Sequence, residues 1–568
     1  MKHSPAPWLR FYAEIPHHLD YPDCTMYQLA AQAAQAYPAR PAYEFMGAVT
    51  DFKTFHRKIL ETASAFAAMG IGKGDRVTLA LPNIPQALWC FYGLNRLGAV
   101  PNMVHPLSAP AEIAFYLRAS HSRAIVAVDS FYARVHEAMA ELDTPAVCIV
   151  VHIADELRFP KNIAYRLSVR KKMPEIPYGE RVIDWRSFFS SADVSKLAPD
   201  TGRGADVGAI LYSGGTTGTT KGILLSNNNF NATALQTKAA SGFTFEPGMK
   251  MLSVMPVFHG FGLGIGIHTA LVFGVECILV PQFSVKTYAK LLRTRKPDVI
   301  PGVPTLFEAL LRAPGLEKTD LSFLKGVFSG GDSLSAELKR KVDAFLKDHG
   351  AKVQIREGYG TTECVTASCL TPRDSHREGS IGIPFPDTYY AICEPGGIRH
   401  LEPGQEGEIC LRGPSVMLGY MDNPEETAAV LCRHDDGEVW LHTGDLGCMD
   451  ADGFIYFRQR IKRMIVSSGY NIYPSQLENI LDAHEKVLLS CVIGVDDPYK
   501  MKKVKAFVVV KPGVIPTPQL REELFAWCRK RIAKYAMPYD IEFRAELPKT
   551  LVGKVAYRVL EEEEAGKK

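Results

Sequence analysis

Short apolar segments of strand length alternate with longer segments of helical pattern through most of the chain. Residues 74–81 read as a turn that leads into a buried strand, 86–97 as a helix and 124–128 as a second apolar strand. Apolar strands that alternate with helices are typical of parallel sheets covered by helices on both faces. The sequence therefore predicts an α/β fold. Its 568 residues exceed what one hydrophobic core usually organises, so we expect at least two domains.

The C-terminal part of the chain has a smaller pattern of its own. Its expected elements are a helix at 477–481, strands at 491–495 and 505–510, and a helix at 520–532. The charged stretch Arg458-Gln-Arg-Ile-Lys-Arg463 precedes them and reads as a junction. We expect a large N-terminal domain over 1–459, built from several subdomains with mixed sheets and helices, and a small α/β domain over 460–568.

Composition excludes little but is consistent with a folded intracellular protein. Charged residues make up 22% of the chain and the formal net charge is +3, which gives no reason to expect nucleic acid as a partner. The twelve cysteines form no Cys-x-x-Cys pair, so neither a zinc site nor a disulfide framework is predicted. This cysteine usage favours a reducing, cytoplasmic compartment. Residues 1–8 contain no apolar run, so no secretory signal is expected.

One apolar run has the length of a membrane span. Residues 260–280 are almost entirely apolar, but Gly274 divides the run and Glu276 interrupts it. We expect a buried helix followed by a buried strand at 277–280, with a transmembrane helix as the less favoured alternative. A stripe of small residues in this run could leave a groove for an alkyl chain, but close helix packing is favoured. The stripe consists of Gly260, Gly262, Gly264 and Gly266.

A basic segment at 156–172 breaks the alternation of helices and strands. Basic and apolar residues are mixed there, among them Arg158, Lys161, Ile163, Arg166 and Leu167. A basic amphipathic segment can rest on an anionic membrane surface. A solvated excursion of the protein surface is the favoured interpretation, and the membrane contact stays open.

The sequence Leu211-Tyr-Ser-Gly-Gly-Thr-Thr-Gly-Thr-Thr-Lys-Gly222 carries the strongest chemical signal, and it ends the apolar strand expected at 207–211. Its glycines let backbone N–H groups approach an anion without a Cβ in the way, while its hydroxyls and Lys221 add donors and positive charge. This chemistry suits a polyphosphate. The lysine precedes glycine rather than Ser or Thr, so the loop is not a Walker A loop. A flexible linker is disfavoured, because a linker needs neither the strand nor the lysine.

Further motifs carry residues suited to a nucleotide. Tyr359 offers a flat face for a base, Glu363 a hard oxygen for Mg²⁺, and Asp445 a carboxylate that can accept two hydroxyl hydrogen bonds. The motifs are Pro256-Val-Phe-His-Gly-Phe-Gly262, Ser329-Gly-Gly-Asp-Ser333, Gly358-Tyr-Gly-Thr-Thr-Glu363, His442-Thr-Gly-Asp445, Arg460-Ile-Lys-Arg-Met-Ile-Val-Ser-Ser-Gly469 and Pro548-Lys-Thr-Leu-Val-Gly-Lys554.

Together with the glycine-rich loop, these motifs resemble the adenylate-forming superfamily of acyl-CoA synthetases, luciferases and peptide-synthetase adenylation domains. The resemblance covers residues 8–558 and is strongest to bacterial long-chain fatty-acyl-CoA synthetases. It departs from the family at Thr220, where many members have proline, and at Ser468, where many have a second glycine. Asp332 is also unusual in its motif.

The resemblance implies the following site. Glu363 and Thr216 would hold Mg²⁺, and Lys554 would bridge the substrate carboxylate and the α-phosphate. The residues implied to bind ATP and AMP are Ser213, Gly214, Gly215, Thr216, Thr217, Gly218, Lys221, Gly331, Tyr359, Gly360, Thr362, Asp445 and Arg460.

The resemblance also implies a mobile C-terminal domain. It would rotate about Lys462, and Gly469 and Ser468 would then line the channel of the coenzyme A thiol. A side chain at position 469 would block that channel. His259 would stand at an aromatic gate, although a lone histidine among apolar residues is more often a satisfied core residue.

The implied function is that of an ATP-dependent ligase that joins a medium- or long-chain fatty acid to coenzyme A through an acyl-AMP intermediate, with ATP, Mg²⁺ and coenzyme A as cofactor and co-substrates. The alternatives are an aryl- or bile-acid–CoA ligase and a fatty acyl-AMP ligase that delivers to a carrier protein. A non-catalytic nucleotide-binding protein is disfavoured by the presence of Lys221, Glu363, Asp445 and Lys554 together. We also expect a cytoplasmic protein. A peripheral position on the inner membrane surface and a homodimer stay open.

Overall fold

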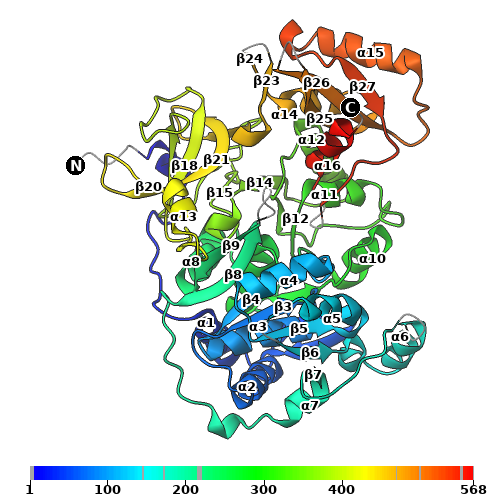
Figure 1. The fold of residues 1–568 in the computed structure, drawn as a ribbon. Helices are drawn as coiled ribbons and strands as arrows, with labels where there is room; N and C mark the ends of the chain where they lie inside the picture. The colour runs from blue at the N-terminus through cyan, green and yellow to red at the C-terminus, as the bar shows by residue number, and fades with distance from the viewer. Residues whose placement is uncertain are drawn as a thin grey trace.

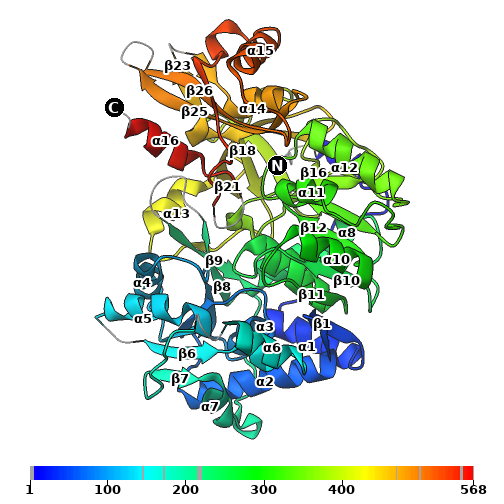
Figure 2. The ribbon, with the colours of Figure 1, turned by 90° about the vertical axis from the view of Figure 1, so that its right-hand side faces the viewer.

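The computed structural model describes residues 6–143, 146–169, 173–213, 220–467, 470–497, 501–550 and 554–566. Four sheets organise these residues. In Figures 1 and 2 the N-terminal and central segments form the lower part of the molecule, and the orange and red C-terminal segments cap its other end. The predicted α/β class, with a large domain followed by a smaller one, is confirmed.

The first large sheet is mostly parallel and carries the predicted strands of the N-terminal part. Its order is β19-β9-β8-β4-β3-β5-β6-β7; the pairs β19–β9 and β9–β8 are antiparallel, and the remaining pairs are parallel. The strands are β3 Arg76–Ala80, β4 Val100–Met103, β5 Ala124–Val128, β6 Val147–Val151, β7 Val182–Asp184, β8 Val207–Ser213, β9 Lys221–Ser226 and β19 Gly419–Tyr420. Helices of this region are α1 Met26–Ala36, α2 Phe52–Ala68, α3 Pro85–Arg96, α4 Pro110–Ala119, α5 Tyr132–Ala140, α7 Trp185–Ser190 and α8 Asn227–Ala240.

The second large sheet follows the order β16-β15-β14-β13-β12-β10-β11-β1-β2. The central strands β10 to β14 and β1 run parallel. Its strands are β1 Pro41–Phe45, β2 Ala48–Asp51, β10 Lys250–Ser253, β11 Glu276–Leu279, β12 Val299–Gly302, β13 Gly326–Ser329, β14 Ile355–Tyr359, β15 Cys369–Leu370 and β16 Ile383–Pro384. Its helices are α9 Ala270–Val272, α10 Val285–Arg295, α11 Pro304–Leu311 and α12 Ala336–Asp348.

The main hydrophobic core joins these two sheets. Helix α3 lies in it, and the residues from Pro85 to Asn95 are all buried. A helix that is buried on every side has apolar residues around its whole circumference, which explains why 86–97 reads as a helix without a polar face. The core thereby fixes the carboxyl ends of strands from both sheets relative to one another.

A third, antiparallel sheet follows. It has the order β17-β18-β21-β20, with β22 paired to β21. The strands are β17 Tyr389–Cys393, β18 Gly407–Arg412, β20 Leu431–Arg433, β21 Val439–Met449 and β22 Ile455–Arg460, and helix α13 Pro424–Val430 precedes β20.

The fourth sheet forms the C-terminal unit with a hydrophobic cluster of its own. The helix expected at 477–481 and both expected strands are present, and the helix expected at 520–532 ends earlier, at Arg529. The elements are β23 Ile465–Ser467, β24 Tyr470–Ile472, α14 Pro474–Asp482, β25 Val487–Asp497, β26 Met501–Val510, α15 Pro518–Arg529, β27 Asp540–Phe543 and α16 Tyr557–Ala565. The boundary between 459 and 460 stays a prediction.

Short helical turns complete the described chain. They are η1 Pro7–Phe11, η2 Asp129–Phe131, η3 Ile153–Glu156, η5 Val194–Lys196, η7 Thr362–Cys364, η8 Ile461–Arg463 and η9 Lys534–Ala536.

The apolar run 260–280 is a buried helix followed by a buried strand, as expected. The helix is a π-helix over Phe261–Thr269 (η6), continued by α9, and β11 follows. Among the described residues, no helix is long and apolar enough to cross a membrane. A Cβ on Gly260 would lie 1.7 Å from the Val365 carbonyl oxygen, and one on Gly264 would lie 2.9 Å from Val365 Cγ1. These two glycines therefore serve close packing.

The basic segment forms helix α6 Lys161–Val169, in which no residue is buried. Its basic side chains point back to the body of the protein: Lys161 Nζ donates to the Met46 carbonyl oxygen at 2.8 Å, and Arg166 pairs with Asp155 at 2.8 Å. The apolar side chains of Phe159, Ile163 and Leu167 are exposed. Residues 170–172 of the predicted segment lie outside the described residues.

Candidate active site

The expected phosphate loop connects two antiparallel strands. Ser213 at the end of β8 pairs with Lys221 at the start of β9, so both ends of the loop are fixed side by side. Lys221 forms an ion pair with Glu426, and its Nζ lies 4.8 Å from the centre of the Tyr420 ring. The predicted nucleotide residues Gly214, Gly215, Thr216, Thr217 and Gly218 lie outside the described residues.

Two parallel strands end beside this hairpin with glycine-containing turns. In one of them, a Cβ on Gly360 would lie 1.5 Å from the Thr366 carbonyl oxygen, so this turn has no room for a side chain. In the other, Gly331 has φ +79°, a backbone conformation that favours glycine. Carboxyl ends of parallel strands are where ligands bind in open α/β sheets. The structure therefore brings together the predicted residues at 331 and 358–362.

Asp445 is the centre of a buried polar group. Its Oδ2 accepts a hydrogen bond from Tyr359 Oη at 2.7 Å, and its Oδ1 lies 3.5 Å from Arg460 Nε. Asp445 and Arg460 face each other across β21 and β22. Burial raises the pKa of Asp445, and Arg460 opposes that shift. Asp445 in turn raises the pKa of Arg460. The geometry thus joins three predicted nucleotide residues.

Glu363 lies on the next turn of the chain. Its Oε1 accepts a hydrogen bond from Tyr420 Oη at 3.0 Å, and its carbonyl oxygen accepts from the Met417 N–H at 2.8 Å. Because Tyr420 also packs against Lys221, this carboxylate and this ammonium group face the same region. Sequence reasoning missed Tyr420 and Glu426, since a tyrosine and a glutamate without a motif carry no signal.

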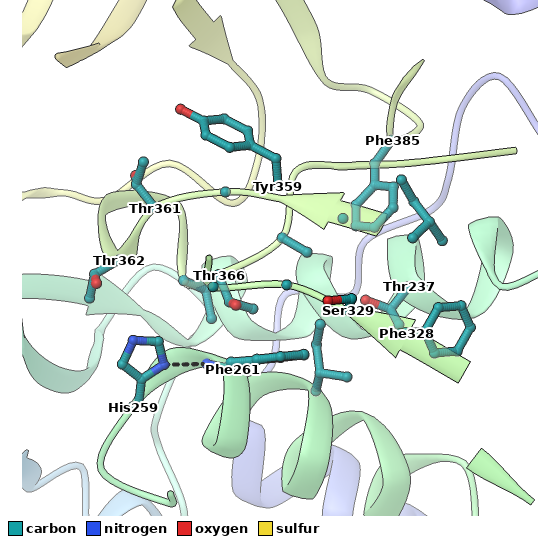
Figure 3. Close-up of a pocket in the computed structure, with 18 of the residues that line it drawn as sticks. Thr237, His259, Phe261, Phe328, Ser329, Tyr359, Thr361, Thr362, Thr366 and Phe385 are labelled. Atoms are coloured by element: carbon teal, nitrogen blue, oxygen red, sulfur yellow. Dashed lines mark hydrogen bonds between the residues drawn. The ribbon is translucent and has the colours of Figure 1, made fainter. Parts of the chain in front are cut away.

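A cavity of about 850 Å³, including the part open to solvent, connects these turns with the protein interior. One end is lined by Gly331, Tyr359, Thr362, Arg460 and Lys554. The other end is apolar and is lined by Phe245, Met251, Val299, Phe328, Leu370 and Phe385. Figure 3 shows His259, Thr361 and Thr362 on one side of the cavity and Phe328 and Phe385 on the other. The apolar end could not be predicted from the sequence, because its residues come from separate parts of the chain and resemble ordinary core residues.

Lys554 and His259 both line this cavity. Burial lowers the pKa of Lys554, and the carboxylate of Asp332 opposes that shift. Burial and the Lys554 ammonium lower the pKa of His259 to about 3. His259 Nδ1 accepts a hydrogen bond from the Phe261 N–H at 3.2 Å, so the imidazole is neutral and held in place. Lys554 comes from the C-terminal unit, which therefore reaches the cavity.

The remaining predicted residues lie near the connection between the two domains. Lys462 is exposed within the short turn Ile461–Arg463, directly after β22. The next residue, Arg463, pairs with Glu478 of α14. Ser468 and Gly469, predicted for the thiol channel, lie outside the described residues.

The chain belongs to the AMP-binding enzyme family, whose model matches residues 30–421. The model for the C-terminal domain of AMP-binding enzymes matches residues 476–554. These matches confirm the resemblance drawn from the motifs.

Particular relatives span the whole chain. A long-chain-fatty-acid–CoA ligase of Bacillus subtilis (strain 168) is 36% identical over 570 residues, which cover 99% of this chain and 98% of that protein. A long-chain-fatty-acid–CoA ligase of Yersinia pestis is 34% identical, with 98% of each chain covered. Among solved structures, ATP-bound MatB from Rhodopseudomonas palustris has a TM-score of 0.80 and 25% identity, covering 95% of this chain and 99% of that one.

Proposed function

We propose that this protein is an ATP-dependent, AMP-forming acid–CoA ligase that activates a medium- or long-chain fatty acid. One observation carries the proposal: a single cavity has predicted nucleotide residues and Lys554 at one end and an apolar lining at the other. The names of the full-length relatives support the same reading.

In the first half-reaction the carboxylate of the acid attacks the α-phosphorus of ATP, and pyrophosphate leaves. The protein's part is to position the reactants and to neutralise charge. Asp445 would hold the ribose hydroxyls, with Tyr359 and Arg460 fixing its orientation. The Lys554 ammonium would lie between the carboxylate and the α-phosphate, where negative charge develops.

Mg²⁺ fits the residues around the phosphate loop. Glu363 supplies a carboxylate beside Tyr420, whose ring also contacts Lys221, and its Oε2 forms no hydrogen bond within the part of the chain that the structure describes. Mg²⁺ in such enzymes is bound by one or two carboxylates together with substrate phosphates. When bound, the ion neutralises phosphate charge. Thr216 is proposed as its second protein ligand.

The second half-reaction requires the C-terminal domain to move, because Lys554 and an incoming thiol cannot occupy the same space. We infer a hinge rotation about Lys462, with the domain boundary between 459 and 460. Gly469 and Ser468 would then line the path of the coenzyme A thiol. The thiol attacks the acyl carbonyl carbon, and AMP leaves.

The apolar end of the cavity supports an alkyl substrate. Its lining holds aromatic and aliphatic side chains, and Thr237 adds a hydroxyl there. The same aromatic lining would also accept an aryl acid, and this alternative is separated by the acid panel described below. The same assay separates delivery to a carrier protein from ligation to coenzyme A, because only the ligase requires coenzyme A for turnover.

We further propose that the protein is cytoplasmic and touches the inner membrane surface through segment 156–172. Exposed Phe159, Ile163 and Leu167, spaced four residues apart, support this contact. Sedimentation with anionic liposomes, compared for the wild type and Leu167→Glu, tests it, and equal sedimentation would contradict it. A homodimer also stays a prediction. Light scattering of the purified chain measures its oligomeric state.

The deciding experiment measures pyrophosphate release with ATP and Mg²⁺ against short to long fatty acids, aryl acids and bile acids, with and without coenzyme A. Turnover that needs coenzyme A and peaks at medium or long fatty acids is the expected result. A peak at aryl or bile acids would reject the fatty-acid assignment. Pyrophosphate release without a thioester product would reject the ligase and favour an adenylate-only enzyme.

A further inference from the structure

The third sheet carries a cluster of cysteine and histidine side chains that the proposed reaction does not use. Cys410 of β18 pairs directly with His442 of β21, and Cys393 of β17 pairs with Glu408 of β18. His434 follows β20. Ligand atoms of Cys410, His434 and His442 all lie within 4.8 Å of one another, and those of Cys393, His400 and His434 form a second group of this kind.

A continuous chain of hydrogen bonds orders the three imidazoles. Glu408 Oε2 lies 2.9 Å from His442 Nδ1, His442 Nε2 lies 2.9 Å from His434 Nε2, and His434 Nδ1 lies 2.9 Å from His400 Nε2. A carboxylate only accepts, so His442 Nδ1 carries a proton and its Nε2 presents a lone pair. Glu408 Oε1 also accepts from the Gly444 N–H at 2.8 Å, which fixes the carboxylate.

The cluster is buried and preorganised. Cys410 is 0% exposed and His434 is 4% exposed. The His434 ring stacks on Trp440, with ring centres 5.4 Å apart and planes at 15°. Neutral imidazole and thiolate are the ligands that Zn²⁺ prefers in proteins.

We propose that Cys410, His434 and His442 bind one Zn²⁺ ion, with His434 and His442 as Nε2 ligands and Glu408 orienting His442. A metal-binding histidine typically donates its other ring N–H to a carboxylate, which is the position of Glu408. The Cys410 thiolate and the Glu408 carboxylate together balance the charge of the ion. Within the described part of the chain, no carboxylate forms a hydrogen bond with the imidazoles of the second group, around Cys393 and His400.

Ion binding changes the protons of the cluster in a defined way. The proton on His434 Nε2 moves to Nδ1, which then donates to His400 Nε2, and the proton of His400 moves to its own Nδ1. The three imidazoles therefore keep three protons in total. Only the Cys410 thiol loses its proton to solvent, so binding releases one proton per ion.

The site has a consequence for the proposed nucleotide clamp. His442 stands three residues before Asp445 on β21, and the Glu408 carboxylate binds the backbone between them at Gly444. An ion on His442 would hold this turn in place. The site is distinct from the proposed Mg²⁺ position, which uses oxygen ligands at Glu363.

Isothermal titration of the full-length protein with Zn²⁺, free of any histidine tag and repeated in buffers of different ionisation enthalpy, tests the proposal. We expect one ion and one released proton per chain. Co²⁺ in place of Zn²⁺ should give a thiolate charge-transfer band. Cys410→Ser and His434→Gln should each weaken binding at least ~10-fold.

Matched controls make the result specific. Cys148→Ser changes another buried cysteine, and His349→Gln changes the histidine directly after α12, and both should bind like the wild type. Cys393→Ser should also retain the ion. Thermal unfolding confirms that each variant is folded. Each of three results would overturn the assignment. The first is the absence of Zn²⁺ binding, and the second is binding that Cys410→Ser leaves intact in a folded protein. The third is binding that Cys393→Ser abolishes while Cys410→Ser does not.

Discussion

Replacing Lys554 with alanine should separate the two half-reactions. The ammonium lies beside the nucleotide turn, since Lys554 Cε is 4.0 Å from the position of a Cβ on Gly331. If the ammonium lies about 4 Å from the negative charge that develops on the α-phosphate, the two charges interact by about 4 kcal/mol in a medium of effective dielectric constant near 20. Loss of one charge-stabilising donor in an active site typically lowers the rate by about 10²–10³. We therefore expect acyl-adenylate formation to fall by about 10³.

The assay follows each half-reaction by itself. Single-turnover formation of labelled acyl-AMP reports the first, and thioester formation from chemically prepared acyl-AMP and coenzyme A reports the second. Thioester formation should stay within about threefold of the wild type. Lys549→Ala is the control, because Lys549 is exposed on the same loop and does not line the cavity. Equal losses in both half-reactions would refute the role given to Lys554.

Three further perturbations probe the site and its surroundings. Asp445→Asn removes a charged acceptor and should raise the KM for ATP at least ~10-fold, whereas exposed Asp435→Asn should not; an unchanged KM would exclude Asp445 from the clamp. Gly360→Ala should abolish ATP binding measured by calorimetry, because the new Cβ meets a backbone oxygen, whereas Gly72→Ala has open space; binding at wild-type affinity would contradict the tight turn. Burial lowers the pKa of His268 to about 3, below the ordinary 6.5, so the native state binds fewer protons and loses stability as pH falls below 6.5. At pH 5 this amounts to about 2 kcal/mol, and urea unfolding of His268→Gln should show a correspondingly smaller loss between pH 7 and pH 5; an identical loss would disprove it.

The sequence predicted the elements that have strong local patterns. The strand at 124–128, the buried helix and strand within 260–280, and the C-terminal α/β unit all follow from apolar periodicity and turn residues. The π-helical form of 261–269 and the close packing of Gly260 and Gly264 against Val365 could not be predicted. Periodicity describes neighbours along the chain and does not describe such contacts.

The candidate site was predictable only where its residues form short motifs. Tyr359, Asp445 and Arg460 belong to motifs, and the structure joins them. Phe328 and Phe385 of the apolar end, like Cys410 and His434 of the cluster, come from separate parts of the chain and have no regular spacing. The absence of a Cys-x-x-Cys pair predicted no zinc site, but cross-strand pairing can assemble ligands that the linear sequence keeps apart.

Asp445 and Arg460 pair on one hairpin, so the residues proposed to hold the ribose lie on a different domain from the lysine proposed for catalysis. Both residues lie on β21 and β22, before the proposed hinge, whereas Lys554 lies far beyond it. If the C-terminal domain rotates away after the first half-reaction, Asp445 and Arg460 stay on the large domain and keep their contact with the ribose, while the Lys554 ammonium leaves the site. The reactive acyl-AMP would thus remain anchored during the exchange of lysine for thiol, and a single nucleotide-binding event would serve both chemical steps.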